Sequence, residues 1–174
     1  MPTQTLARVT EMTPLNDFAW SMTLEVSDMI RTTLKNPGQF VHVKCGDQRL
    51  LRRPISVCSC SEDSPSDLLR LVFEVRGDGT DWLAHRTVGD KVDVMGLLGN
   101  GFTLSPTGRY LLVGGGIGVP PMLGCAQSAP GRCDAVLGFR DKAHALLMDD
   151  FAPVCPTVAV ATEDGSLGEK GFVT

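Results

Sequence analysis

The hydrophobic pattern of this 174-residue chain changes near residue 105, and that change limits the folds open to it. Before this point, short segments alternate apolar and polar residues between turn sequences, a pattern typical of antiparallel strands. After it, continuous apolar runs alternate with segments of helical composition, which is typical of parallel strands covered by helices. The sequence therefore predicts a β region over 1–105 and an α/β region over 106–174.

The first region contains segments whose alternation is that of half-buried strands. Turn sequences rich in Pro, Gly, Asn and Asp separate them, residues 61–67 are expected to form a polar loop, and 76–86 a loop with a short helix. Short strands at roughly even spacing are typical of a small antiparallel barrel. We expect a six-stranded antiparallel barrel with strands over 5–12, 18–26, 39–45, 51–60, 68–75 and 91–96.

The second region contains apolar runs separated by helical segments. We expect parallel strands over 110–116, 135–139 and 157–162, helices over 120–129 and 142–151, and the start of another helix in 168–174. Doubly wound nucleotide domains usually carry five or six strands. The region is therefore predicted to be a partial Rossmann-like parallel-sheet domain that is cut short at Thr174.

Charge and hydropathy limit the partners of the chain. It carries 16 Lys and Arg against 20 Asp and Glu, a net charge of -4, and no basic run beyond Arg52-Arg53. Nucleic-acid and anionic membrane surfaces need a clustered positive field, so neither partner is expected. The N-terminus lacks a secretory pattern, and the most apolar run, 110–123, is too short to cross a bilayer. We expect a cytoplasmic protein.

The six cysteines and three histidines have no spacing that favours chemistry. There is no C-x2-C pair, and a reducing compartment disfavours disulfides. We expect the thiols to be buried and to pack as small hydrophobic groups, with no metal site. His42, His85 and His144 lie in separate segments and are expected to be surface or capping residues, so no catalytic residue is assigned.

A glycine-rich stretch, Gly114–Gly118, follows the first apolar run of the second region. A strand that ends in a tight turn before a proline-initiated helix presents free amides that suit a pyrophosphate. The literal G-x-G-x-x-G spacing is absent, and a turn that only allows close packing stays the alternative. At the tip of the next run, Arg140 or Asp141 is expected either to touch the nucleotide or to be a solvated loop charge.

The segment "RRPIS" places two arginines before a proline at the start of a strand. The guanidinium of Arg53 suits a phosphate, Pro54 removes a ladder donor, and Ser56 lies on the same strand face as Pro54. Arg52 is expected to be solvated. An edge strand with gatekeeping charges is the alternative reading of the whole segment.

Two glycine motifs of the first region also have two interpretations. Gly79 and Thr80, in "GDGT", either offer amides and a hydroxyl to phosphate oxygens or form an ordinary capped turn. Gly96–Phe102, "GLLGNGF", is either a junction turn or a backbone surface that lies close to a flat ligand.

Together, "RRPISV", "VFEVRGDGT", "GLLGNGF", "LLVGGGIGVPPML", "GFRDKAHALLMDDF" and "TEDGSLGEKGFVT", in this order and spacing, resemble a known family. It comprises the electron-transfer subunits of NAD-dependent dihydroorotate dehydrogenases, in the ferredoxin-reductase superfamily. The resemblance covers essentially the whole chain. It implies a ferredoxin-reductase-type FAD-binding barrel over 1–105 and an NAD-binding α/β domain over 106–174.

The resemblance also implies roles for single residues. Arg53 would contact the flavin pyrophosphate, Ser56 would lie near the isoalloxazine, and the dinucleotide loop would run from Gly114 to Pro120. The cofactor-binding residues implied in this way are Arg53, Pro54, Ile55, Ser56, Val72, Phe73, Glu74, Gly79, Thr80, Gly114, Gly115, Gly116, Ile117 and Gly118.

The chain departs from the family pattern in three places. Ile55 stands where the superfamily favours an aromatic residue, so the flavin is expected to lie against an aliphatic side chain. Leu97 stands where a proline is frequent. Family members also carry a cysteine-rich tail that binds a [2Fe-2S] cluster, and the sequence stops before any such tail. FAD without a cluster is therefore expected of this chain.

The resemblance implies that the chain passes electrons from an FMN-containing subunit that oxidises dihydroorotate, through FAD, to NAD+ in pyrimidine biosynthesis. The two kinds of subunit would form a heterotetramer. One alternative is the reductase component of another ferredoxin-reductase-like system that serves an oxygenase or a ferredoxin. A non-catalytic module or fragment with the same fold is the other.

Overall fold

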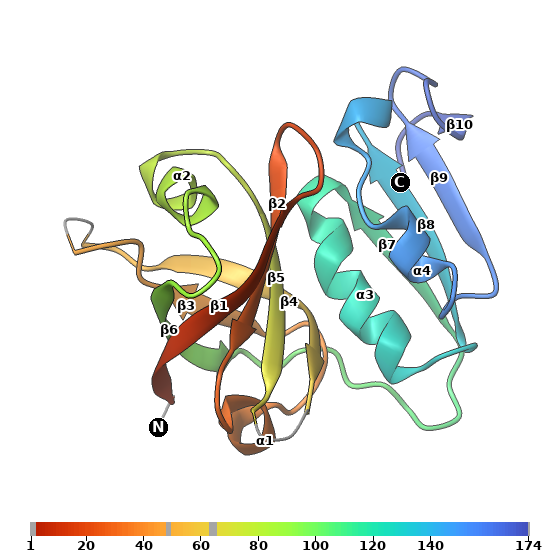
Figure 1. Cartoon of the computed structure of the whole chain (residues 1–174). Coiled ribbons are helices and arrows are strands. Elements are labelled where there is room, and N and C mark those ends of the chain that lie inside the picture. The colour runs from red at the N-terminus through yellow and green to blue at the C-terminus, as the bar shows by residue number, and fades with distance from the viewer. Residues whose placement is uncertain (1–2, 48–49, 63–65, 174) are drawn as a thin grey trace.

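The computed structural model describes residues 3–47, 50–62 and 66–173, and the predicted loop 61–67 lies partly outside this set. Within the described residues, six antiparallel strands close into a barrel in the order β1-β2-β5-β4-β3-β6, as predicted (Figure 1). They are β1 Gln4–Pro14, β2 Ala19–Glu25, β3 Phe40–Val43, β4 Arg53–Ser61, β5 Leu68–Glu74 and β6 Lys91–Leu98.

The barrel core follows the alternation of the strands. In β3, the side chains of Val41 and Val43 are fully buried, whereas those of Phe40 and His42 are half-buried. A short helix that the sequence did not predict, α1 (Met29–Thr33), adds Met29 and Ile30 to the same core. Five residues are too few to show a helical period, so this helix has no sequence signature.

A second sheet holds four parallel strands of the described chain, one more than predicted, in the order β10-β9-β8-β7. Helix α3 (Val119–Ser128) follows β7 and opens with prolines at its first turn, as predicted. Gly115 pairs with Gly138 and Phe139 with Thr162, so the carboxyl ends of three strands meet at one edge. The strands are β7 Tyr110–Gly115, β8 Cys133–Phe139, β9 Val158–Thr162 and β10 Glu169–Lys170.

The predicted helix over 142–151 is wrong. The segment forms a single 3-10 turn, Lys142–His144, and a short helix α4 (Met148–Phe151). Leu147, between them, is left-handed at φ 61° and is buried with Leu146 in the core. Burying two consecutive leucines at a bend takes precedence over the helical composition of the segment.

The predicted helix start in 168–174 is also wrong within the described residues. Glu169 and Lys170 form β10, which pairs in parallel with β9. Gly168, at φ 66°, leads into this strand at a position where an added Cβ would overlap the carbonyl oxygen of Val160. The glycine therefore allows the close approach that starts strand pairing.

The barrel and the parallel sheet share an apolar interface. Figure 1 shows α3 between them, and an added Cβ at Gly124 of α3 would lie 3.1 Å from the carbonyl oxygen of Cys58 in β4. Cys58, Ala19 and Val72 of the barrel are buried in one cluster with side chains of the second region. Arg70 of β5 pairs with Asp150 of α4 at 2.5 Å. The two regions are therefore packed against each other and do not only share a linker.

No helix in the described part of the chain is both long enough and apolar enough to cross a membrane.

Candidate functional site

A pocket of about 280 Å³ lies at the rim of the barrel, where β4, β5 and α2 (Asp78–Ala84) meet. It brings together the three segments that the sequence analysis assigned to flavin binding, and Ile117 of the glycine-rich loop closes one side. Its lining residues are Arg53, Pro54, Ile55, Ser56, Val72, Phe73, Glu74, Arg76, Thr80 and Ile117.

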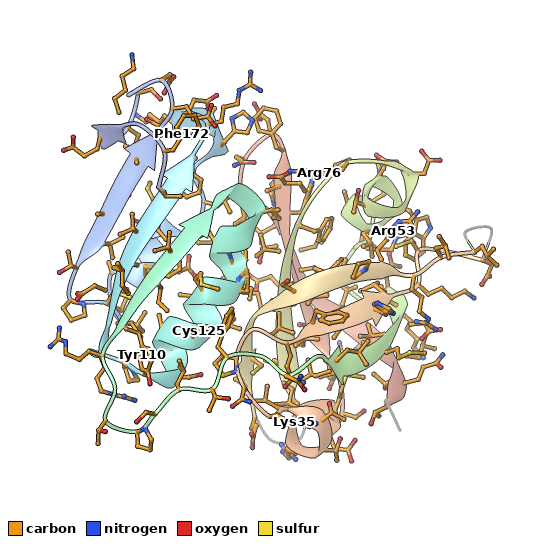
Figure 2. The ribbon with its side chains drawn as sticks, turned by 180° about the vertical axis from the view of Figure 1, so that it is seen from behind. Lys35, Arg53, Arg76, Tyr110, Cys125 and Phe172 are labelled. Atoms are coloured by element: carbon orange, nitrogen blue, oxygen red, sulfur yellow. The ribbon has the colours of Figure 1, made fainter. Side chains whose placement is uncertain are left out.

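Arg53 lies across the first turn of α2, beside Gly79 (Figure 2). An added Cβ at Gly79 would lie 2.5 Å from Arg53 Nε, so this approach needs a glycine. The Arg53 guanidinium donates to the carbonyl of Leu51 at 3.2 Å and lines the pocket. The first-turn amides of a helix have no acceptor within the helix. Arg53 and Thr80, a residue of that first turn, both line the pocket. This combination fits the pyrophosphate of a dinucleotide flavin.

The residues predicted to bind flavin fall into an exposed group and a buried group. Pro54 and Ser56 are exposed on the outer face of β4, as the strand alternation predicts. The side chains of Ile55, Val72 and Phe73 are 6%, 3% and 3% exposed and belong to the core. Ile55 belongs to the barrel core and also lines the rim pocket, so the expectation that a flavin lies against its side chain stays a prediction.

Thr80 shapes the turn that precedes α2. Its hydroxyl accepts a hydrogen bond from the Arg76 amide at 2.8 Å and donates to the Gly77 carbonyl at 3.0 Å. The hydroxyl proton is thus used within the turn, and Thr80 holds the start of α2 in place. The structure shows the capped turn of "GDGT", and phosphate binding at this turn stays a prediction.

Arg52 is not solvated, contrary to expectation. Its guanidinium pairs with the Asp93 carboxylate at 2.7 Å and donates to the carbonyls of Asp93 and His42. The Arg52 side chain is 20% exposed. It joins β4 to β3 and β6, so the two adjacent arginines have different roles because strand alternation directs them to opposite faces.

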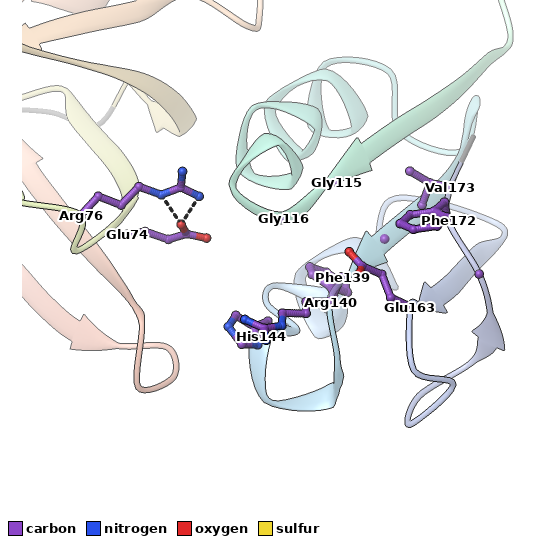
Figure 3. A pocket seen from close by; sticks show the side chains of 12 residues that line it. Glu74, Arg76, Gly115, Gly116, Phe139, Arg140, His144, Glu163, Phe172 and Val173 are labelled. Atoms are coloured by element: carbon purple, nitrogen blue, oxygen red, sulfur yellow. Dashed lines mark hydrogen bonds and ion pairs between the residues drawn. The ribbon is translucent and has the colours of Figure 1, made fainter.

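A second pocket, of about 440 Å³, lies at the carboxyl ends of β7, β8 and β9 (Figure 3). This is where open α/β sheets bind ligands. Its lining residues are Glu74, Arg76, Gly115, Gly116, Gly138, Phe139, Arg140, His144, Glu163, Gly171, Phe172 and Val173.

The glycine-rich loop forms one wall of this larger pocket. β7 ends at Gly115, a 3-10 turn covers Gly116–Gly118, and α3 begins directly afterwards. Gly116 has a φ of 50°, and an added Cβ at Gly114 would lie 3.0 Å from the Cα of Val119. The loop therefore combines close packing of strand and helix with a tight turn at a helix start, the arrangement that binds phosphate in dinucleotide domains.

Arg140 and Asp141, the alternatives for nucleotide contact, take different roles. Arg140 lines the larger pocket. Asp141 turns back to cap the 3-10 turn: Asp141 Oδ1 accepts from the His144 amide at 3.1 Å and lies 2.8 Å from His144 Nδ1. Hydrogen bonding to His144 holds the pKa of Asp141 below its ordinary value. Of the two, Arg140 is therefore the one that faces the pocket.

Glu74 and Arg76 line both pockets, and the sequence analysis did not single out Arg76. Arg76 donates to Glu74 Oε2 at 2.6 Å, and its side chain is 73% exposed while that of Glu74 is 18% exposed. Figure 3 shows the pair across the larger pocket from His144 and Arg140. The only sequence signal was a charge directly after a strand and before a glycine turn.

The motif Gly96–Phe102 packs as a junction turn. The Phe102 amide donates to Pro37, Asn36 donates to the Asn100 carbonyl, and Gln39 donates to the Gly99 carbonyl. None of the seven motif residues lines either of the two pockets. Phe102 lines a separate pocket of about 400 Å³ beside β7, so the motif packs as a turn and its contact with a flat ligand stays a prediction.

The cysteines pack as expected. Five of the six are buried, and Cys60 is half-buried. Burial raises the pKa of Cys58 to about 12 and that of Cys125 to about 11. Among the described residues, no cluster of three or more His, Cys, Asp or Glu side chains is arranged to hold a metal ion.

Curated proteins show clear sequence similarity to the chain. It is 44% identical over 159 residues to the "Dihydroorotate dehydrogenase B (NAD(+)), electron transfer subunit" of Bacillus caldolyticus, which covers 87% of this chain and 61% of that protein. The subunit of the same name from Desulforamulus reducens is 42% identical over 158 residues, with coverages of 87% and 59%. The chain thus spans about three fifths of these relatives. No protein-family model matches it.

Solved structures share the fold. An NADH-dependent reduced ferredoxin-NADP oxidoreductase superposes with a TM-score of 0.80 at 28% identity, over 96% of this chain and 60% of that one. The cytochrome P450 reductase of Amycolatopsis gives 0.79 at 23% identity, over 98% and 56%, and supports the fold alone. The chain is therefore a relative of the electron transfer subunits of NAD-dependent dihydroorotate dehydrogenase B, with the fold of the ferredoxin-reductase superfamily.

Proposed function

We propose that this chain binds FAD in the pocket at the barrel rim and NAD in the pocket at the end of the parallel sheet, and passes electrons between them. Residues 1–105 would form the flavin domain and 106–174 the dinucleotide domain. The observation that carries the proposal is the wall shared by the two pockets, Glu74 and Arg76. Because both residues line both pockets, the two spaces adjoin, and a flavin and a nicotinamide that extend past these side chains would come into the direct contact that hydride transfer needs.

The residues of the barrel rim would bind and orient the flavin. Arg53 and the first-turn amides at Gly79 and Thr80 would bind the pyrophosphate, and the exposed hydroxyl of Ser56 would face the ring system. Ile55, Val72 and Phe73 would keep the strand edges rigid from within the core. When bound, FAD supplies the hydride chemistry, and the protein supplies placement.

The glycine loop would orient the dinucleotide. The amides of Gly115 and Gly116 lie at the start of α3, where the partial positive charge of the helix favours phosphate, and Ile117 reaches the flavin pocket. Gly114 and Gly118 hold the turn that positions them. Arg140 adds a cation at the adjoining strand tip.

Curated relatives are named as electron transfer subunits of dihydroorotate dehydrogenase B, so the partner we propose is the catalytic, FMN-containing subunit that oxidises dihydroorotate. The pair would assemble as a heterotetramer in the cytoplasm and serve pyrimidine biosynthesis. The described residues provide no cluster of metal ligands, and no step of the proposal passes through one.

The test begins with the visible spectrum of the purified chain. A yellow protein that releases FAD, and whose flavin is bleached by NADH without oxygen, supports the proposal. A folded, colourless protein that takes up no added FAD contradicts it. Arg53→Ala should weaken FAD retention while the barrel stays folded, whereas Ser56→Ala should retain FAD and change the rate of its reduction.

The partner needs a separate experiment. Co-expression with a dihydroorotate-oxidising subunit should give a complex that reduces NAD+ when dihydroorotate is added. A yellow, NADH-reducible chain that binds no such subunit and reduces a ferredoxin would favour the other reductase class.

A further inference from the structure

The turn between β1 and β2 reaches over to the wall of the larger pocket. Phe18, in this turn, stacks on His144 with ring centroids 4.0 Å apart and an interplanar angle of 7°. His144 lines the larger pocket, and Phe18 does not. The imidazole therefore stands between the barrel and the space in which the dinucleotide is proposed to bind.

Asn16 fixes the same turn. Its side-chain oxygen accepts from the amides of Phe18 and Ala19 at 2.9 and 2.8 Å, which holds the turn closed. Its side-chain nitrogen donates to the carbonyl of Ala145 at 3.5 Å, one residue after His144. The turn between β1 and β2 thus contacts the loop 140–145, which lies at the larger pocket, through a ring stack and a hydrogen bond.

His144 is also held from within its own loop. Asp141 accepts from its amide and lies 2.8 Å from its ring nitrogen Nδ1. The ring is thus constrained on one face by Phe18 and along one edge by Asp141, and its side chain is 25% exposed. Arg140, directly before this capped turn, lines the same pocket.

We infer that the Phe18–His144 stack is a positioning contact that sets the dinucleotide affinity of the larger pocket from the barrel side. The inference rests on the proposed function. The stack holds the loop 140–145 against the pocket, so its loss frees the wall that carries His144 and Arg140. The two regions themselves stay joined through the Arg70–Asp150 pair and the shared apolar cluster.

The test compares Phe18→Leu with Phe18→Tyr in the FAD-loaded chain. Leucine keeps apolar bulk without a ring, and tyrosine keeps the ring, with its hydroxyl free to reach solvent because Phe18 is 41% exposed. An aromatic pair contributes about 0.5–1.5 kcal/mol beyond burial, so we expect Phe18→Leu to weaken NAD+ binding by about 2- to 10-fold in calorimetry. Phe18→Tyr should bind as the wild type does.

Two further readouts separate positioning from general damage. FAD content and the rate of flavin reduction at saturating NADH should stay within about twofold of wild type in Phe18→Leu, while the half-saturating NADH concentration rises with the dissociation constant. Leu6→Ala, which truncates another exposed apolar side chain of the barrel, is the matched control and should change none of these.

The inference is overturned if Phe18→Leu binds NAD+ as tightly as the wild type does, whether or not its FAD content falls. It is also overturned if Phe18→Tyr loses as much NAD+ affinity as Phe18→Leu. A wild-type chain that binds FAD but no NAD+, or neither, overturns the proposed function and this inference together. The two failures are therefore distinguished by the wild-type titration.

Discussion

Arg53 occupies the space next to the Cα of Gly79, so that a Cβ at residue 79 would lie 2.5 Å from Arg53 Nε. Arg53 and Gly79 are 26 positions apart in the chain, and the fold places the guanidinium against the first turn of α2. The contact brings the arginine of "RRPIS" against the glycine of "GDGT", two residues for which we propose one ligand.

Gly79→Ala should displace the Arg53 side chain and weaken FAD binding by about tenfold or more, the value of a charge-assisted hydrogen bond. The measurement is the FAD dissociation constant from flavin fluorescence. Gly77→Ala is the control, because its φ of 169° is extended and an added Cβ meets nothing within 4 Å. Similar FAD affinities for the two variants would contradict the Arg53–Gly79 assignment.

Arg52→Ala should destabilise the barrel and leave the FAD affinity of the folded protein unchanged. It leaves the Asp93 carboxylate and two carbonyls without their cation, at a cost of about 1–3 kcal/mol. Denaturant unfolding measures the change. Arg53→Ala should behave in the opposite way, with weaker FAD binding and nearly normal unfolding.

Alkylation by iodoacetamide at pH 8 should modify Cys60 first and leave Cys58 and Cys125 unmodified until the protein unfolds. Burial raises the pKa of these two thiols to about 12 and about 11, so they stay protonated and inaccessible. Peptide mass spectrometry after timed labelling checks the order.

The same raised pKa values predict how stability depends on pH. In the unfolded chain these thiols ionise near pH 9, whereas in the folded protein they stay protonated to higher pH, so the free energy of unfolding should fall between about pH 9 and pH 12.

The carboxyl group of Asp141 should titrate below its ordinary value of 3.8 in the wild type, because hydrogen bonding to His144 favours the charged form. The folded pKa is lowered, so the contribution to stability is present above pH 3.8 and is lost as the pH falls through the lowered pKa. In His144→Phe, which keeps a ring against Phe18 but removes the ring nitrogen, the pKa should rise. Carbon-detected NMR titration measures both.

Much of the fold was predictable because it depends on local alternation. The six barrel strands and the turn that joins β7 to α3 follow from side-chain periodicity and from Gly and Pro placement. The helix over 142–151 was mispredicted because Leu146 and Leu147 are buried at a bend. Contacts with the assembled core stabilise that bend, and the local sequence does not show them.

The site was predictable in part. Arg53, Ser56 and Thr80 line the rim pocket and Gly115 and Gly116 line the larger one, whereas Gly79, Gly114 and Gly118 line neither. Arg76 has only a weak local signal and the Phe18–His144 stack has none, because both contacts depend on strands and loops that are distant in sequence.

The sequence by itself determined the strand pattern, the two glycine turns and the family likeness, since each depends on residue type and spacing along the chain. Only the tertiary structure decided which of two adjacent arginines lines a pocket and which one pairs with Asp93. It also decided that "GLLGNGF" packs as a turn against 36–39, and that the barrel contacts the wall of the larger pocket through Phe18. These outcomes depend on contacts between residues far apart in the chain, which local pattern does not encode.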